Sequence, residues 1–159
     1  MKVVKPAEDR ATPRGVVGGA EISQATTGAT NIYMGVFRVP AGAQSRPHYH
    51  ESCESAVYML SGSLEVKWGD QLEQTVTIGP GDMVYVPPRE THLLTNLSDA
   101  EAAEYVVARD SPTEDSVEVP WAGLAAEVSD NCSGVGRRGF GPVGGPSAGV
   151  WSRIGDYSG

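Results

Sequence analysis

The chain has 159 residues, only three of them histidine, and a formal net charge of −8. This length fits one domain, and the acidic balance argues against a nucleic-acid partner, whose phosphates require clustered lysine and arginine. There is no apolar run of about 18 residues to span a membrane, no apolar signal core in the first ten residues, and no disulfide framework, because Cys53 and Cys132 lie far apart. We therefore expect a cytoplasmic protein without nucleic-acid or membrane partners.

The first two thirds of the chain predict strands after a short leading segment. Residues 1–20 are predicted to form a polar N-terminal arm, because Pro6 and Pro13 discourage a helix there. Short β-branched and aromatic runs then follow, each ended by Gly, Pro, Asn or Asp. The predicted strands cover residues 32–39, 54–60, 63–68, 72–78, 83–86, 92–96 and 102–108, with Ser61-Gly62 as a hairpin turn. This pattern predicts an all-β antiparallel sandwich or barrel over residues 21–112.

The last third of the chain loses the strand pattern. Residues 113–130 are predicted to be a peripheral segment, in which Pro120 can begin a short helix over 120–128. Residues 131–159 are too glycine-rich for a regular element and favour a flexible tail. The alternative is that the tail docks on the barrel or on a neighbouring subunit through three apolar anchors, Trp151, Ile154 and Tyr157.

All three histidines lie in two stretches that strands can bring together. His48 and His50 point to the same face of a strand, because side chains alternate with a period of two. Glu54 follows closely, and His92 begins a later predicted strand. Imidazoles with one carboxylate suit a divalent first-row metal such as Fe, Mn, Ni, Cu or Zn. Histidines that merely fill the core are the less favoured alternative, since a buried imidazole without a partner is costly.

These two stretches resemble the two motifs of the cupin superfamily. The first motif reads Gly, five residues, His-x-His, three or four residues, Glu, six residues, Gly, and is matched by Gly42, His48, His50 and Glu54. The second motif is matched by Gly81, Pro87, His92 and Asn96. The resemblance covers most of residues 30–108 and implies a jelly-roll β-barrel with one metal ion. Cupin-like arms often pack on a partner subunit, so we also expect a homodimer.

The sequence departs from the first motif near Glu54. The closing Gly62 comes seven residues after Glu54 instead of six, so counting back from Gly62 places Ser55 at the ligand position. A one-residue slip would turn Glu54 to the other face of its strand. We predict that a β-bulge between Glu54 and Tyr58 absorbs the extra residue and keeps the carboxylate inside. Without the bulge, three histidines and water would bind the metal, with Glu51 or Cys53 as substitutes.

Four further side chains are candidates for substrate binding or proton transfer. Arg46 and Arg89 can bind a substrate carboxylate or phosphate, or stay as solvated charges at the rim. Arg89 stands where the motif has glycine, which costs about 1 kcal/mol or more if the turn needs a positive φ. Tyr85 is a candidate for substrate binding, and Tyr58 with Glu54 for acid–base catalysis. The alternative for both tyrosines is a role in the barrel wall.

The family resemblance implies an enzyme without specifying the reaction, because cupin folds host many activities. We prefer a dioxygenase-type oxidoreductase in which the metal binds a small organic substrate and O₂. A second hypothesis is a non-redox cyclase, isomerase or lyase that resembles the polyketide cyclases among cupins, with the metal as a Lewis acid. A third hypothesis is a non-catalytic module that binds a small molecule.

Overall fold

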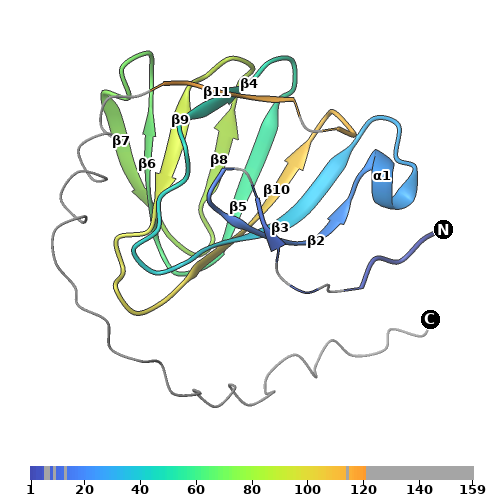
Figure 1. Ribbon diagram of the computed structural model, residues 1–159, viewed down its shortest axis with the longest axis horizontal. Coiled ribbons are helices and arrows are strands. Elements are labelled where there is room, and N and C mark those ends of the chain that lie inside the picture. The colour runs from blue at the N-terminus through green and yellow to red at the C-terminus, as the bar shows by residue number, and fades with distance from the viewer. Residues whose placement is uncertain (6–7, 9, 13, 114, 121–159) are drawn as a thin grey trace, which may run out of the picture. The chain divides into compact units, whose positions relative to one another are not determined.

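We describe the chain from a computed structural model that covers residues 1–5, 8, 10–12, 14–113 and 115–120 (Figure 1). Eleven strands form two antiparallel sheets in this part of the chain. The first sheet contains, in spatial order, β1 (Arg10–Ala11), β2 (Val17–Ile22), β3 (Tyr33–Val39), β10 (Ala103–Arg109), β5 (Ser55–Ser61) and β8 (Met83–Val86). The second contains β11 (Ser116–Glu118), β4 (His48–His50), β9 (His92–Thr95), β6 (Leu64–Trp68) and β7 (Gln74–Ile78). The predicted all-β jelly-roll architecture is confirmed.

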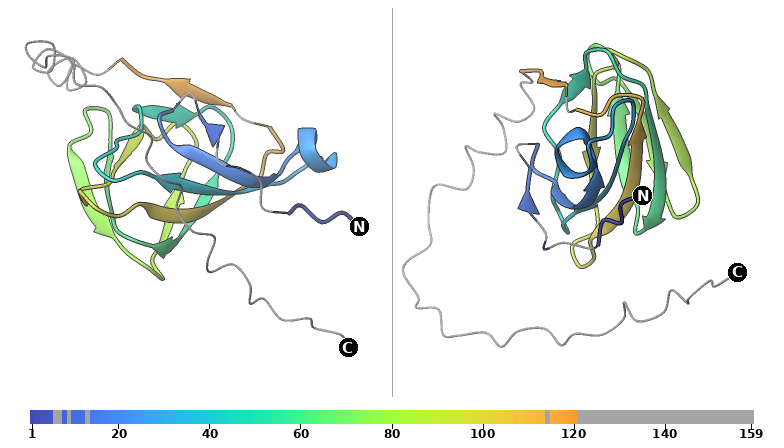
Figure 2. Two further views of the ribbon diagram at one scale, coloured as in Figure 1. Left: turned by 60° about the horizontal axis from the view of Figure 1, so that its bottom comes forward. Right: turned by 90° about the vertical axis from the view of Figure 1, so that its right-hand side faces the viewer.

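The core lies between the two sheets, which face each other in Figure 2. Along β3 and β10 side chains alternate strictly between buried and more exposed positions, as expected for strands with one buried face. Inward positions of β10 hold Ala103, Tyr105 and Val107, and the last of them holds Arg109. The alternation therefore places one charged side chain at the inner end of an otherwise apolar row.

The predicted hairpin at Ser61-Gly62 is wrong, although a turn does occur there. β5 pairs with β10 and β8, whereas the next strand, β6, pairs with β7 and β9 in the other sheet. The turn therefore carries the chain from one sheet to the other. Gly62 has a φ of 70°, and a Cβ at this position would lie 2.7 Å from the Cα of Ala103, so a larger residue would clash.

Part of the predicted N-terminal arm belongs to the first sheet. β2 pairs with β3, and a one-turn helix, α1 (Gln24–Thr27), follows it. Between β1 and β2 the chain makes a tight turn in which the Gly15 amide donates to the Thr12 carbonyl, 3.1 Å away. The Arg46 amide donates to the Arg14 carbonyl over 2.8 Å. This bond attaches the turn to the segment that leads into β4.

The predicted helix over 120–128, apart from Pro120, and the glycine-rich tail lie outside the described residues. Within the described part of the chain, no helix is long and apolar enough to cross a membrane. The outer face of the first sheet carries exposed apolar side chains from three strands, namely Met34, Val36, Tyr58, Leu60, Met83 and Tyr85. Whether this face or the N-terminal arm contacts a second copy is untested, so the homodimer stays a prediction.

Candidate metal centre

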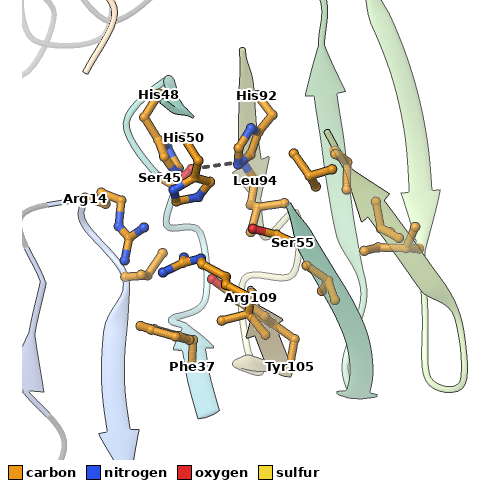
Figure 3. A pocket seen from close by; sticks show the side chains of 17 residues that line it. Arg14, Phe37, Ser45, His48, His50, Ser55, His92, Leu94, Tyr105 and Arg109 are labelled. Atoms are coloured by element: carbon orange, nitrogen blue, oxygen red, sulfur yellow. Dashed lines mark hydrogen bonds between the residues drawn. The ribbon is translucent and has the colours of Figure 1, made fainter. Parts of the chain in front are cut away.

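Three histidines from two neighbouring strands converge at one end of the space between the sheets (Figure 3). His48 and His50 are on β4, and His92 on β9 pairs directly with His48. All three are buried, and one ring nitrogen from each lies within 4.8 Å of the others. The His-x-His spacing and the predicted strand at 92–96 thus bring the imidazoles together as expected.

Hydrogen bonds fix which nitrogen of each ring faces the cluster. The Nδ1 atoms of His48 and His92 lie 2.8 Å from the carbonyl oxygens of Arg46 and Glu90. A carbonyl oxygen only accepts, so each Nδ1 carries the proton and each Nε2 keeps its lone pair. The Nδ1 atom of His50 is 3.3 Å from Oδ1 of Asp115. All three rings therefore have a bonded Nδ1 and an Nε2 available to a metal ion.

Burial disfavours the charged form of His48 and His92, and metal binding requires neutral rings. Burial, followed by the charge of His92, lowers the pKa of His48 to about 2. Burial also lowers the pKa of His92, and the charges of Arg109 and Arg14 act in the same direction. A donor set of three imidazole nitrogens fits a divalent transition metal ion.

The histidines form one wall of a cavity between the sheets that has a volume of about 50 Å³. The rest of its lining is mostly apolar, with Phe37 and Tyr105 among the aromatic side chains. Among the polar residues, Ser55, Arg14 and Arg109 line the cavity, and all three are buried. Neither arginine was identified from the sequence as a site residue.

The structure does not bring Glu54 to the histidines. Glu54 is exposed and its carboxylate accepts a hydrogen bond of 2.9 Å from the Tyr85 hydroxyl on the outer side of the sheet. The ladder between β5 and β8 is regular from Ser55 to Tyr58, so the bulge predicted there is wrong in position. The register shift occurs at Leu60, where neighbouring residues of β10 pair with Met59 and Ser61. Ser55, the residue counted back from Gly62, lines the cavity instead.

The tyrosines proposed for catalysis and substrate binding also lie away from the cavity. Tyr58 and Tyr85 are 41% and 62% exposed on the outer face of the first sheet. Tyr58 points to the face of β5 opposite to that of Ser55 and Val57, which line the cavity. Tyr85 lies on the same outer face of the sheet as Tyr58. This arrangement does not place either phenol beside the histidines.

The two arginines proposed as a substrate clamp also lie outside the cavity lining. Arg46 is exposed and forms an ion pair of 3.2 Å with Glu118. β4 begins only at His48, and of the residues just before it Ser45 lines the cavity and Arg46 does not. Arg89 is exposed and pairs with Glu51, so neither Glu51 nor Arg89 faces the cluster.

Arg89 has a φ of 63°, the left-handed conformation in which glycine is favoured. We expect Arg89→Gly to be more stable than Arg89→Ala by about 1 kcal/mol, because both lose the ion pair to Glu51 and only glycine removes the backbone strain. Urea denaturation of the two variants, side by side, measures this difference. Equal stability would contradict the strain.

A hydrogen-bond network behind His50 was not predicted from the sequence. Asp115 accepts from the Ser52 amide (2.9 Å), the Ser52 hydroxyl (3.0 Å) and the Cys53 thiol (3.2 Å). Burial raises the pKa of Asp115, but these bonds and the nearby His50 outweigh it and hold the pKa at about 2. Burial, with the bond to Asp115, raises the pKa of Cys53 to about 12, so the thiol stays protonated and is a poor metal ligand. The network therefore orients His50 instead of forming a second metal site.

We expect Asp115→Asn to weaken metal affinity by about 10–100-fold, because the carboxylate accepts from Nδ1 of His50 and keeps Nε2 directed at the cluster. Competition with a chromogenic chelator measures the affinity. Cys53→Ala is the matched control, since it removes a neighbour of Asp115 without touching His50, and it should retain affinity close to that of the unaltered protein. Equal losses in both variants would assign Asp115 a packing role.

Comparison with known proteins agrees with this geometry. A family described as "Cupin domain" matches residues 35–108. The protein SchB of Streptomyces halstedii is 34% identical over 83 residues, which are 52% of this chain and 58% of SchB. The polyketide synthase CurC of Streptomyces cyaneus is 31% identical over 81 residues, 51% of each chain. This chain therefore matches little more than half the length of these two relatives.

Solved structures share the fold at low sequence identity. The polyketide cyclase RemF of Streptomyces resistomycificus has a TM-score of 0.61 and 21% identity, over 76% of this chain and 87% of RemF. An oxalate decarboxylase of Lactobacillus farciminis has a TM-score of 0.59 and 21% identity, over 83% of this chain and 39% of the enzyme. Together with the two sheets and the buried histidines, these matches lead to one conclusion: residues 35–108 are a cupin domain.

Proposed function

We propose that the chain is a metal-dependent enzyme that acts on a small organic molecule, with His48, His50 and His92 as ligands of one divalent transition metal ion. The observation that carries this proposal is the convergence of three buried imidazoles whose Nδ1 atoms are all hydrogen-bonded. Fe, Mn, Ni, Cu and Zn all suit such ligands. A divalent ion held there supplies positive charge that polarises a carbonyl oxygen of the substrate.

We further propose that the reaction is non-redox, of the cyclase, isomerase or lyase type. Three neutral ligands leave the charge of a divalent ion undiminished, which favours its use as a Lewis acid. The two-histidine, one-carboxylate set typical of iron oxygenases is not found among the described residues of the cavity, because Ser55 lies where the carboxylate was expected. The relationship to CurC, a polyketide synthase, adds a candidate substrate class, a linear poly-β-ketone.

The dioxygenase preferred from the sequence stays a prediction. Three histidines leave coordination positions open, and the same ligands accept a redox metal. The non-catalytic binding module likewise stays open, since the same cavity could hold a small molecule without reacting with it.

The test begins with untagged protein, whose metal content is determined by elemental mass spectrometry. The protein is then loaded separately with each candidate metal and incubated with a linear tri-β-ketone, in parallel with metal-free protein. Product masses and O₂ uptake are recorded. A cyclase leaves the mass unchanged or lowers it by one water and consumes no O₂, whereas a dioxygenase adds two oxygen atoms.

A metal-dependent product without O₂ uptake would support the proposal. Stoichiometric O₂ consumption would move the assignment to the dioxygenase. If the protein contains no metal as purified and takes up none on loading, the proposal of a metal-dependent enzyme is overturned and the non-catalytic binding module remains.

A further inference from the structure

Two buried arginines share the cavity with the histidines, and they are the charged side chains that its described lining contributes. Arg14 is 8% and Arg109 7% exposed. Figure 3 shows both guanidinium groups between the histidines and the aromatic rings of Phe37 and Tyr105. The lining therefore brings two guanidinium groups, with their several N–H donors, to the same space as the histidines.

Both guanidinium groups are held in place by the surrounding structure. The Arg109 guanidinium carbon lies 5.0 Å from the centre of the Tyr33 ring, and that of Arg14 lies 5.8 Å from the centre of the Phe37 ring. Both distances allow cation–π attraction. The Arg14 backbone is attached to Arg46 through its carbonyl oxygen. A planar, oriented guanidinium matches a carboxylate better than a flexible ammonium group does, because it can donate two parallel hydrogen bonds.

Ser55 adds an independent observation. Its side chain is 3% exposed and lines the cavity, and its Oγ atom has no hydrogen-bond partner among the described residues. A buried hydroxyl without a partner is costly, so a polar ligand atom in the cavity would stabilise it. At this position the cavity lining carries a hydroxyl in place of the carboxylate that the motif has.

The size of the space constrains the ligand further. The inner cavity, at about 50 Å³, has room for only a few water-sized groups. A groove of about 840 Å³ lies on the other side of Arg14 and Phe37, which are part of both walls. Binding sites for small organic molecules have volumes of about 300–1,000 Å³, so the groove and not the cavity fits the body of a substrate.

We infer that Arg14 and Arg109 form an oxyanion site, and that the substrate is an organic carboxylate whose acidic group enters the inner cavity while its body lies in the outer groove. This inference rests on the proposed function for the identity of the ligand as substrate, but the arginine site itself does not require the metal. A phosphate group has the same charge chemistry, yet it is bulkier than a carboxylate for so small a cavity.

The test compares two probes of nearly equal shape, 4-fluorobenzoate and its neutral analogue 4-fluorobenzamide. Fluorine NMR titration measures their affinities for the full chain, with zinc bound and after zinc removal. We expect the benzoate to bind more tightly than the benzamide in both forms. Arg14→Gln should weaken benzoate binding by roughly tenfold or more, because a charge-assisted hydrogen bond is lost, and change benzamide binding by less than about twofold.

Matched variants separate this role from general effects. Arg46→Gln removes an exposed arginine that lies outside the cavity lining. This variant should bind benzoate like the unaltered protein. Arg109→Lys keeps the charge and loses the planar donor pair, so it should weaken benzoate binding while leaving zinc content unchanged. Thermal melting shows whether each variant is folded, and if Arg14→Gln is not, the comparison is made with Arg14→Lys.

Equal affinity of the two probes, or an equal loss of both in Arg14→Gln, would overturn the oxyanion site. Tighter binding of inorganic phosphate than of 4-fluorobenzoate would overturn the carboxylate assignment. Failure to take up any of the candidate metals, with the arginine-dependent preference intact, would refute the proposed function and leave this inference standing. Normal zinc uptake without the preference would overturn this inference and leave the proposed function standing.

Discussion

Replacing His48 by alanine is expected to reduce bound metal from near one ion per chain to a small fraction of an ion per chain. The loss of metal affinity should be well above about 100-fold. Removal of a residue that only orients a ligand costs about 10–100-fold, so removal of a ligand should cost more. Among the described residues only His48, His50 and His92 make up this group of possible ligands, so no fourth described side chain stands ready to replace the Nε2 of His48. Elemental mass spectrometry after reconstitution and desalting measures the content.

Glu54→Gln is the matched control for this experiment. Because Glu54 is exposed and bonded to Tyr85, its substitution should leave the metal content unchanged. A loss as large as that of His48→Ala would restore Glu54 as a ligand and contradict the placement described above. Retention of a full metal complement by His48→Ala would remove the histidine cluster from consideration.

The metal-free protein is expected to lose stability as the pH falls from about 7 towards 4.5. The pKa of His48 is about 2 in the folded state and 6.5 in the reference state. Above pH 6.5 the imidazole is neutral in both states and contributes nothing to pH dependence. Below pH 6.5 the unfolded chain binds a proton that the folded chain does not, which favours unfolding by about 1.4 kcal/mol per pH unit. Between pH 6.5 and 4.5, His48 alone should therefore lower the free energy of unfolding by roughly 2–3 kcal/mol.

Urea denaturation in the presence of a chelator, repeated across this pH range, measures the effect. His48→Gln has no group that titrates at this position. Its free energy of unfolding should therefore fall less steeply with decreasing pH, by up to about 1.4 kcal/mol per pH unit. Asp115 does not interfere, because its reference pKa of 3.8 lies below the range. Parallel pH profiles for the two proteins would show that His48 is not held neutral by burial.

The histidine cluster could be predicted because each of its members obeys a local rule. Period-two alternation sets His48 and His50 on one face, and the turn residues around residues 79–91 fix where the strand of His92 begins. The placement of Glu54 could not be predicted in the same way, because the motif allows three or four residues after His50. With four residues, the ligand position falls on Ser55 and its carboxylate is replaced by a hydroxyl. The register of β5 decides between these possibilities, and long-range pairing with β8 and β10 sets that register.

The remaining site residues differ in how visible they are in the sequence. Arg109 continues the inward row of β10, so alternation extended by one residue beyond the predicted strand would have found it. Arg14 reaches the cavity through a turn attached to Arg46, and Asp115 reaches His50 across 65 positions of the chain. Neither residue belongs to a periodic pattern or a motif. Only the folded arrangement identifies them.

Arg14, Arg109 and Asp115 all lie outside residues 35–108, whereas the three histidines lie inside. Proteins that share this domain can therefore inherit the same metal ligands and still differ in what they bind, because the flanking segments supply the charged and orienting groups. A fragment trimmed to the domain boundaries would keep the imidazoles and lose both guanidinium groups. Substrate choice in such proteins can then evolve by exchange of the segments that flank the domain, without any change to the metal ligands inside it.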